Sequence, residues 1–377
     1  MSRFIANRGP VQVLAPTGSA RRRLLRSIAV GVPRIGASWL HPYVGALIEK
    51  GPKWPWYRRL FARREARRIN RAIDAGIEHV CLVYDCGVCP LTYGDYLHFV
   101  MIMRYLGERD IGATLYLLDS DIYPLCRAIM NDEEIEGFLQ EMVEIGGLLL
   151  PYPKVQTKRV HELREVMEFV GSHEPYVVCG WQTRHRRALF HHGFNIFNHL
   201  MASAPSELQD RVLLSSSDLA QVALPVDVPS PRVAWHVRHS DKDPSRNLTP
   251  EEFLGLHEIL RTRHPDHTII VVSDDAGCQH CSELVEEHRL GRTVFSKDYS
   301  QSFLGDAALV LGSDLDCVLR GGGMNIVPIM SRIPYRCTSG LAHELMWSAD
   351  QLTSWQGPKQ RYAVAVDLKL ARAMLMS

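Results

Sequence analysis

Short apolar runs rich in β-branched residues alternate with helical patterns along most of this 377-residue chain. In the second half, apolar runs at 232–238 and 267–274 flank a helical pattern at 249–264. Thr249 is expected to cap that helix, with Glu252 completing a capping box. Strand, helix, strand is the βαβ unit, and such units build parallel sheets. The alternation therefore predicts the α/β fold class.

The alternation occurs on both sides of a stretch with three prolines at 223–231, which predicts a linker. We therefore expect two Rossmann-like α/β domains facing across a cleft, with ligands at the carboxyl ends of the strands. The predicted segments are 1–77, a basic leader; 78–228, the first α/β domain; 229–345, the second; and 346–377, a C-terminal segment. The remaining expected strands are 78–85, 113–121, 175–181, 292–296 and 309–313, and the remaining expected helices are 96–106, 132–147 (ending at glycine), 184–202, 281–290, 300–309 and 324–332.

The formal net charge of +1 conceals a basic leader, because the first 77 residues hold sixteen Lys and Arg against three Asp and Glu. At 54–73, aromatic residues precede a helical run of arginines. Such a helix can lie at an anionic membrane surface, bind phosphates or be an ordinary solvated helix. Nucleic acid is not an expected partner, because the rest of the chain is acidic and carries no stacking motif.

The apolar stretches and the cysteines indicate in which cellular compartment the protein is found. The sequence has no uncharged apolar stretch of membrane-spanning length and no signal-like apolar region near its start, so we expect a cytoplasmic protein, with contact to the inner face of the membrane if the leader binds lipid. Nine cysteines, an odd number, do not indicate a disulfide framework. The two Cys-x-x-Cys pairs, Cys86 with Cys89 and Cys278 with Cys281, are far apart, so we interpret them as buried thiols and predict no metal site.

Polar side chains gather where the expected strand 232–238 ends, in the sequence VAWHVRHSDKD. The alternation of a strand places His236 and Arg238 on one side and Val237 on the other. A guanidinium group makes bidentate contacts with phosphate oxygens, and a histidine ring can bind a base, ribose or phosphate. His236 and Arg238 are therefore predicted to bind a ligand; the alternative is a surface strand end with solvated charges.

Two further motifs support this prediction. In VVSDD (271–275), Ser273, Asp274 and Asp275 offer hydrogen-bond acceptors at a second strand end, although serine and aspartate are also common helix N-caps. A glycine triplet precedes the expected helix 324–332, where backbone N–H groups and the helix N-terminus suit a diphosphate. The triplet matches neither a P-loop nor a dinucleotide fingerprint, and a plain helix-initiating loop is the alternative. Its members are Gly321, Gly322 and Gly323.

HVRHSDK (236–242), VVSDD and FLGDAALVLGS (303–313) together resemble the donor domain of the fucosyltransferase superfamily, which includes α1,6-, nodulation and protein O-fucosyltransferases. The resemblance covers 232–340. It implies a GT-B fold and inverting transfer from a GDP-sugar, most often GDP-fucose, to a glycan acceptor, with no metal or other cofactor. It also implies that Arg238 holds the β-phosphate and that His236 and Asp274 contact guanosine.

The sequence departs from that family in two places. His239 stands where a second arginine is common, and the glycine triplet where a serine-rich segment is common. The identity of the sugar therefore stays open. The alternatives are a glycosyltransferase that uses a UDP-, CMP- or dTDP-linked sugar and a non-catalytic module that binds a nucleotide sugar or a glycan.

The first domain carries a Gly-Asp pair in TYGDYLHFVMIMRYL (92–106), between its first strand and first helix. An inverting transfer needs a base that takes the proton of the acceptor hydroxyl and a group that stabilises the departing diphosphate. Arg238 and the glycine loop suit the second task. For the first, Asp95 is the predicted catalytic base and His98 the second choice, although Asp95 could equally be the N-cap of the following helix.

Overall fold

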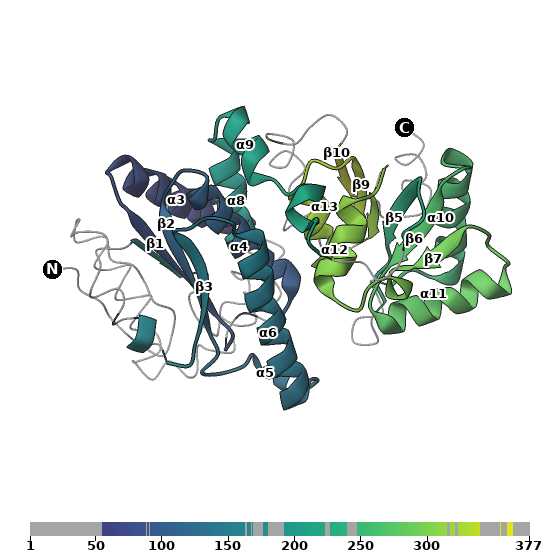
Figure 1. The fold of residues 1–377 in the computed structure, drawn as a ribbon, viewed down its shortest axis with the longest axis horizontal. Helices are drawn as coiled ribbons and strands as arrows, with labels where there is room; N and C mark the ends of the chain where they lie inside the picture. The colour runs from purple at the N-terminus through teal and green to yellow at the C-terminus, as the bar shows by residue number, and fades with distance from the viewer. Residues whose placement is uncertain are drawn as a thin grey trace.

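A computed structural model describes two lobes that lie side by side, each built on one parallel sheet (Figure 1). The fold class is therefore α/β, as the alternation predicts. The domain boundaries remain predictions. The described residues are 55–87, 89, 91–162, 164–166, 168, 176–179, 192–222, 227–239, 247–314, 317–320, 323–339, 355 and 360–364.

The first sheet has the strand order β3-β2-β1-β4, with every neighbouring pair parallel. Its strands are β1 (His79–Asp85), β2 (Gly112–Leu118), β3 (Val155–Val160) and β4 (Tyr176–Cys179). The central strands β1 and β2 are almost fully buried, as expected of parallel strands that are covered on both faces. The edge strand β3 was not predicted, because only its terminal valines are buried and its middle residues are polar.

The helices of the first lobe are α3 (Pro55–Asp74), α4 (Tyr93–Gly107), α5 (Pro124–Arg127), α6 (Asp132–Leu149), α8 (His192–Ala202) and α9 (Ser206–Val212), with the short turn η3 (Ser216–Leu219). Helix α4 contacts β1 and β2 of its own lobe and reaches the second lobe as well. Residues 184–191 of the expected helix 184–202 lie outside the described residues.

The prediction that α6 ends at its glycines is wrong, because the helix continues through Gly146 and Gly147 to Leu149. A Cβ atom on Gly146 would collide with the hydroxyl groups of Thr157 in β3 and Tyr96 in α4. The glycine therefore serves close packing between α6, β3 and α4 rather than helix termination.

The second sheet is also parallel, with the order β10-β9-β8-β5-β6-β7. Its strands are β5 (Arg232–His236), β6 (Thr268–Val272), β7 (Thr293–Phe295), β8 (Cys317–Arg320), β9 (Tyr335–Ser339) and β10 (Gln360–Val364). From β5 the chain winds outward through β6 and β7, and then returns to the other side of β5 with β8. The sheet is therefore doubly wound, with its topological switch point between β5 and β8. Strand β10 comes from the segment 346–377.

The helices and short turns of this lobe are α10 (Pro250–Arg263), α11 (Asp275–Glu287), η5 (Ser296–Asp298), α12 (Phe303–Leu311), η6 (Gly323–Asn325) and α13 (Ile326–Ile329). Thr249 and Glu252 form the predicted capping box at the start of α10. Helix α11 begins well before the predicted residue 281. The predicted strand 309–313 is wrong, because α12 continues to Leu311 and the strand follows as β8. The predicted helix 324–332 is shorter, consisting of η6 and α13.

Two hydrophobic clusters stabilise the described part of the fold. In the smaller cluster, Val233 and Trp235 of β5 pack with α10, where the indole ring of Trp235 stacks on Phe253 with centroids 4.8 Å apart. The larger cluster extends through both lobes and includes Ala234 of β5. Helices α12 and α13 lie on the side of the second lobe that faces the first (Figure 1), and α13 contacts α4. The alternation of β5 thus divides its side chains between the two clusters.

Candidate functional site

The switch point of the second sheet is bridged by a hydrogen bond between His236 and Asn325. His236 is the last residue of β5 and is 8% exposed, and its Nδ1 lies 3.1 Å from Oδ1 of Asn325, the last residue of η6. The turn η6 follows β8, so one residue ends β5 and the other lies in the turn after β8, the two strands at which the order of the sheet reverses. In doubly wound sheets ligands bind at this position, outside the carboxyl ends of the strands.

His236 is neutral across the ordinary pH range. Burial lowers its pKa to about 4, and Arg238 acts in the same direction, while the hydrogen bond to Asn325 and the charge of Asp274 oppose the change. A neutral imidazole has one donor and one acceptor nitrogen. Any contact of His236 with a ligand would therefore be a hydrogen bond rather than an ion pair.

Arg238 follows two residues after the end of β5 and is half-buried. Its Nη1 donates to Oδ1 of Asn247, 3.1 Å away, and this contact orients the guanidinium group. The ring of the neighbouring His239 stacks on His280 of α11, with centroids 4.5 Å apart. The charged residues at 241–243 lie outside the described residues.

At the end of β6, Ser273 is buried, and its Oγ donates to the carbonyl oxygen of Val237, 2.6 Å away. Its hydroxyl group therefore ties the ends of β5 and β6 together. Asp274 is the N-cap of α11 and accepts a hydrogen bond from the backbone N–H of Gly277 at 2.8 Å. The alternative that this aspartate caps a helix is therefore confirmed. Both Asp274 and Asp275 are exposed at the carboxyl edge of the sheet. Donor binding by these three residues remains a prediction.

The glycine triplet is described only in part. Gly321 and Gly322 lie outside the described residues, and Gly323 begins η6. The predicted helix dipole at this place is weak, because η6 has three residues and α13 only four. A diphosphate cradle here would thus depend on backbone N–H groups, and it remains a prediction.

Asp95 lies in the first turn of α4. The N-cap is Thr92, so the N-cap alternative for Asp95 is wrong. Oγ1 of Thr92 donates to Oδ2 of Asp95 at 2.5 Å, yet burial dominates and raises the pKa of Asp95 to about 7. His98, one turn later, is also buried. Helix α4 contacts η6, so the helix that carries Asp95 packs against the turn that carries Asn325.

Lys297 and Asp306 form a polar pair that was not among the predicted site residues. Nζ of Lys297, just beyond the end of β7, lies 2.9 Å from Oδ2 of Asp306 in α12, and both side chains are largely buried. Burial raises the pKa of Asp306 to about 6, although Lys297 lowers it. The signal was a lysine directly after the expected strand 292–296. A third strand end of this sheet is therefore polar.

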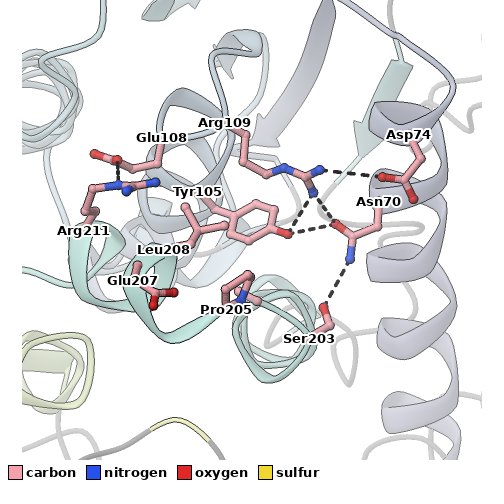
Figure 2. Close-up of a pocket in the computed structure, with 11 residues that line it drawn as sticks. Asn70, Asp74, Tyr105, Glu108, Arg109, Ser203, Pro205, Glu207, Leu208 and Arg211 are labelled. Carbon is pink, nitrogen blue, oxygen red and sulfur yellow. Dashed lines mark hydrogen bonds and ion pairs between the residues drawn. The ribbon is translucent and has the colours of Figure 1, made fainter.

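A pocket of about 520 Å³ lies at the other end of α4 (Figure 2). Its lining includes Asn70 and Asp74 of α3, Tyr105 and Arg109 at the end of α4, and Arg211 of α9. Asn70 Oδ1 accepts hydrogen bonds from Tyr105 Oη and Arg109 Nη1, as Figure 2 shows. No predicted site residue lines this pocket. Among the described residues, no cluster of His, Cys, Asp or Glu side chains is arranged to hold a metal ion.

Comparison with known proteins finds similarity only to solved structures. No protein-family description matches the chain, and neither does any curated protein. The heptosyltransferase WaaC of E. coli with ADP aligns over 79% of this chain and 97% of its own, with 10% identity and a TM-score of 0.45. ADP-heptose LPS heptosyltransferase II of E. coli aligns over 79% and 98%, with 12% identity and a TM-score of 0.42. A family 9 glycosyl transferase of Veillonella parvula aligns over 76% and 85%, with 11% identity and a TM-score of 0.37.

Proposed function

We propose that this protein is a glycosyltransferase that uses a nucleotide-sugar donor. One observation carries the proposal: α4, which bears a buried carboxylate with a pKa of about 7, packs against the turn that closes the switch point of the other sheet. A base with a pKa near neutrality suits removal of a proton from a hydroxyl group at physiological pH. A switch point suits a nucleotide. The helix that bears this carboxylate and the turn beside the switch point meet at the contact between the lobes.

In the proposed reaction, the oxygen of an acceptor hydroxyl group attacks the anomeric carbon of the sugar and the bond to the diphosphate breaks. The proton of the hydroxyl passes to Asp95. Arg238 stabilises the negative charge that develops on the diphosphate, as a guanidinium group does well. His236 holds the nucleoside through hydrogen bonds. The configuration at the anomeric carbon inverts in this single displacement.

GDP-fucose is the first donor to test, because it is the donor that the sequence motifs around His236, Arg238 and Asp274 suggest. UDP-, CMP- and dTDP-linked sugars are the alternatives, and ADP belongs in the panel because solved heptosyltransferases of similar fold bind it. A non-catalytic module that binds a nucleotide sugar or a glycan is the second candidate function.

Thermal unfolding with GDP, UDP, CMP, dTDP and ADP tests the donor site. A nucleotide at 100 times its Kd adds about 2.7 kcal/mol to the free energy of unfolding, which raises the Tm by several degrees. We expect this shift for GDP. Arg109→Lys, in the pocket of Figure 2, should leave the shift unchanged. A shift with another nucleotide but not with GDP would reject the GDP-sugar donor, and no shift at all would reject the nucleotide site. Binding without transfer of any sugar would favour the non-catalytic module.

We also propose that α3 contacts an anionic membrane surface. Arg63, Arg67 and Arg71 are exposed and spaced four residues apart, so they lie along one face of the helix, whereas Ala66 and Ile69 are buried. No helix that the structure describes is both long and apolar enough to span a bilayer. Contact would thus be peripheral, at the inner face of the membrane if the protein is cytoplasmic. A glycan acceptor with anionic groups is the alternative partner for this face.

Replacing all three arginines with glutamate should weaken binding to vesicles with 30% phosphatidylserine by at least 100-fold, because each basic residue near the surface contributes about 1 kcal/mol. Arg164→Glu, on an exposed arginine outside this helix, is the matched control. Sedimentation with vesicles measures the binding. Equal binding of the triple variant and the unmodified protein would reject membrane contact, and so would equal binding to neutral vesicles.

A further inference from the structure

The carboxylate of Glu141 in α6 forms hydrogen bonds with residues of both lobes. Its Oε1 accepts a hydrogen bond from the backbone N–H of Phe303 in the second lobe, 2.9 Å away. Its Oε2 accepts a hydrogen bond from the hydroxyl group of Tyr93 in the first lobe. Tyr93 is the first residue of α4, and Phe303 is the first residue of α12. One side chain therefore contacts the starts of two helices from different lobes.

Three aromatic rings, those of Tyr93, Phe138 and Phe303, pack together beside this carboxylate contact. The ring of Tyr93 stacks on Phe138 of α6, with centroids 4.0 Å apart and an interplanar angle of 9°. On the other lobe it meets Phe303, with centroids 4.6 Å apart and an angle of 33°. Such ring contacts are favourable beyond the area that they bury and hold the phenol of Tyr93 in place. Burial raises the pKa of the Tyr93 phenol, with Glu141 acting in the same direction, so Tyr93 stays protonated as the donor.

Glu141 accepts the hydrogen bond of a backbone N–H group that has no acceptor within α12. The first N–H groups of a helix have no partner within the helix. Ser302 caps α12 by accepting from the N–H of Gly305, 3.1 Å away, whereas the N–H of Phe303 takes its acceptor from Glu141. A negative charge at this position also interacts favourably with the helix dipole. The first turn of α12 is thus completed by the first lobe.

Glu141 contacts a segment of each lobe that leads to residues discussed above. On the first lobe, Tyr93 stands two residues before Asp95 in the turn that Thr92 caps. On the second lobe, α12 carries Asp306, which binds Lys297 at the end of β7. Movement of α12 relative to α4 would therefore change the position of Asp95 relative to the carboxyl edge of the donor sheet.

We propose that Glu141 is a positioning residue, which holds the first turn of α4, and with it Asp95, in register with the donor-binding sheet. The proposal rests on the proposed function, since positioning has meaning only if Asp95 acts on an acceptor at this site. Its structural part, the fixing of two helix starts by one carboxylate, can be tested without any substrate.

Hydrogen exchange measured by mass spectrometry tests the structural part in the full chain. In Glu141→Ala, the amides of 93–97 and of 303–305 should exchange roughly 10-fold faster, because local opening of both helix starts becomes easier. Glu144→Ala removes a glutamate of the same helix that is exposed and bonded to Gln140, and it should leave both segments unchanged. Unchanged exchange in Glu141→Ala would overturn the proposal whatever the activity.

Steady-state kinetics test the positioning part. Glu141→Ala should lower kcat roughly 10- to 100-fold, because small misplacements of a catalytic group are costly, while the KM for the donor stays within about twofold. Glu141→Gln should retain most of the activity, since its amide can accept from Phe303 and donate to Tyr93. Tyr93→Phe keeps the ring stack, loses only one hydrogen bond, and should show a smaller loss of kcat.

The kinetic outcomes distinguish this proposal from the proposed function. The apparent pKa in the pH profile of kcat should move in Glu141→Ala and stay fixed in Glu144→Ala. A Glu141→Ala protein with unchanged kcat and pH profile would overturn the positioning role. If the unmodified protein transfers no sugar from any nucleotide donor, the proposed function fails and the positioning role fails with it, while the exchange measurement still decides whether Glu141 fixes the two helix starts.

Discussion

Replacing Asp95 with asparagine is expected to lower kcat by about 10²- to 10⁴-fold, because the variant keeps the shape of the side chain but cannot take a proton. The hydroxyl group of Thr92 can still donate to the remaining oxygen. In the unmodified protein, kcat should rise with pH through about 7, the pKa to which burial raises Asp95, since the base must be ionised to act. A pH series of initial rates with the donor identified by thermal unfolding measures both effects.

The same substitution should make the protein more stable at pH 8. The pKa of Asp95 is higher in the folded than in the unfolded state, so ionisation lowers the free energy of unfolding as the pH rises from about 4 to about 7. The neutral amide carries no such cost. Lower activity together with a higher Tm at pH 8 would separate a catalytic role from a folding role. If Asp95→Asn keeps near-normal kcat, the base is another group, and His98→Ala is the next variant to measure.

Arg238→Lys is expected to lower kcat/KM by about 100-fold, comparable to the loss of one preorganised donor to a developing anion. A lysine keeps the charge but cannot reproduce the planar, bidentate contact with diphosphate oxygens. Arg261→Lys is the matched control in the same lobe, because the Arg261 guanidinium binds the carbonyl oxygens of Pro265 and His267 away from the switch point. Near-normal turnover in Arg238→Lys would remove Arg238 from the phosphate-binding role.

The strands that the sequence predicts best are β1, β2, β5 and β6. The edge strands β4 and β7 were also predicted, as 175–181 and 292–296, whereas the inner strands β8 and β9 were not. β1, β5 and β6 are buried on both faces, so they appear in the sequence as continuous apolar runs with polar residues at their ends. The edge strands β3 and β10 contain several polar residues and were missed. The apolar run at 309–313 was taken for a strand, because a short apolar segment does not by itself distinguish a strand from the end of a buried helix.

Part of the candidate site could also be predicted from the sequence. His236 ends a strand, and Arg238, Asp274 and Asp275 follow strands, so the rule that ligands bind at carboxyl ends was enough to select them. Asn325 depends on a contact that no local pattern encodes, because it meets His236 only where β8 returns beside β5. Glu141 was not singled out, since its partners Tyr93 and Phe303 lie in different lobes.

The large hydrophobic cluster includes residues of both lobes, so the core does not divide at the predicted linker 223–231. Helix α4 of the first lobe covers α13 of the second, and Leu214 donates a backbone hydrogen bond to Met330 across the same contact. If the second lobe were produced without the first, apolar side chains of α13 would be exposed to water. Each exposed aliphatic side chain costs about 1.5–3 kcal/mol of stability. The proposed catalytic step is therefore better tested in the intact chain, where Asp95→Asn removes the proposed base and leaves the apolar contact between the lobes in place.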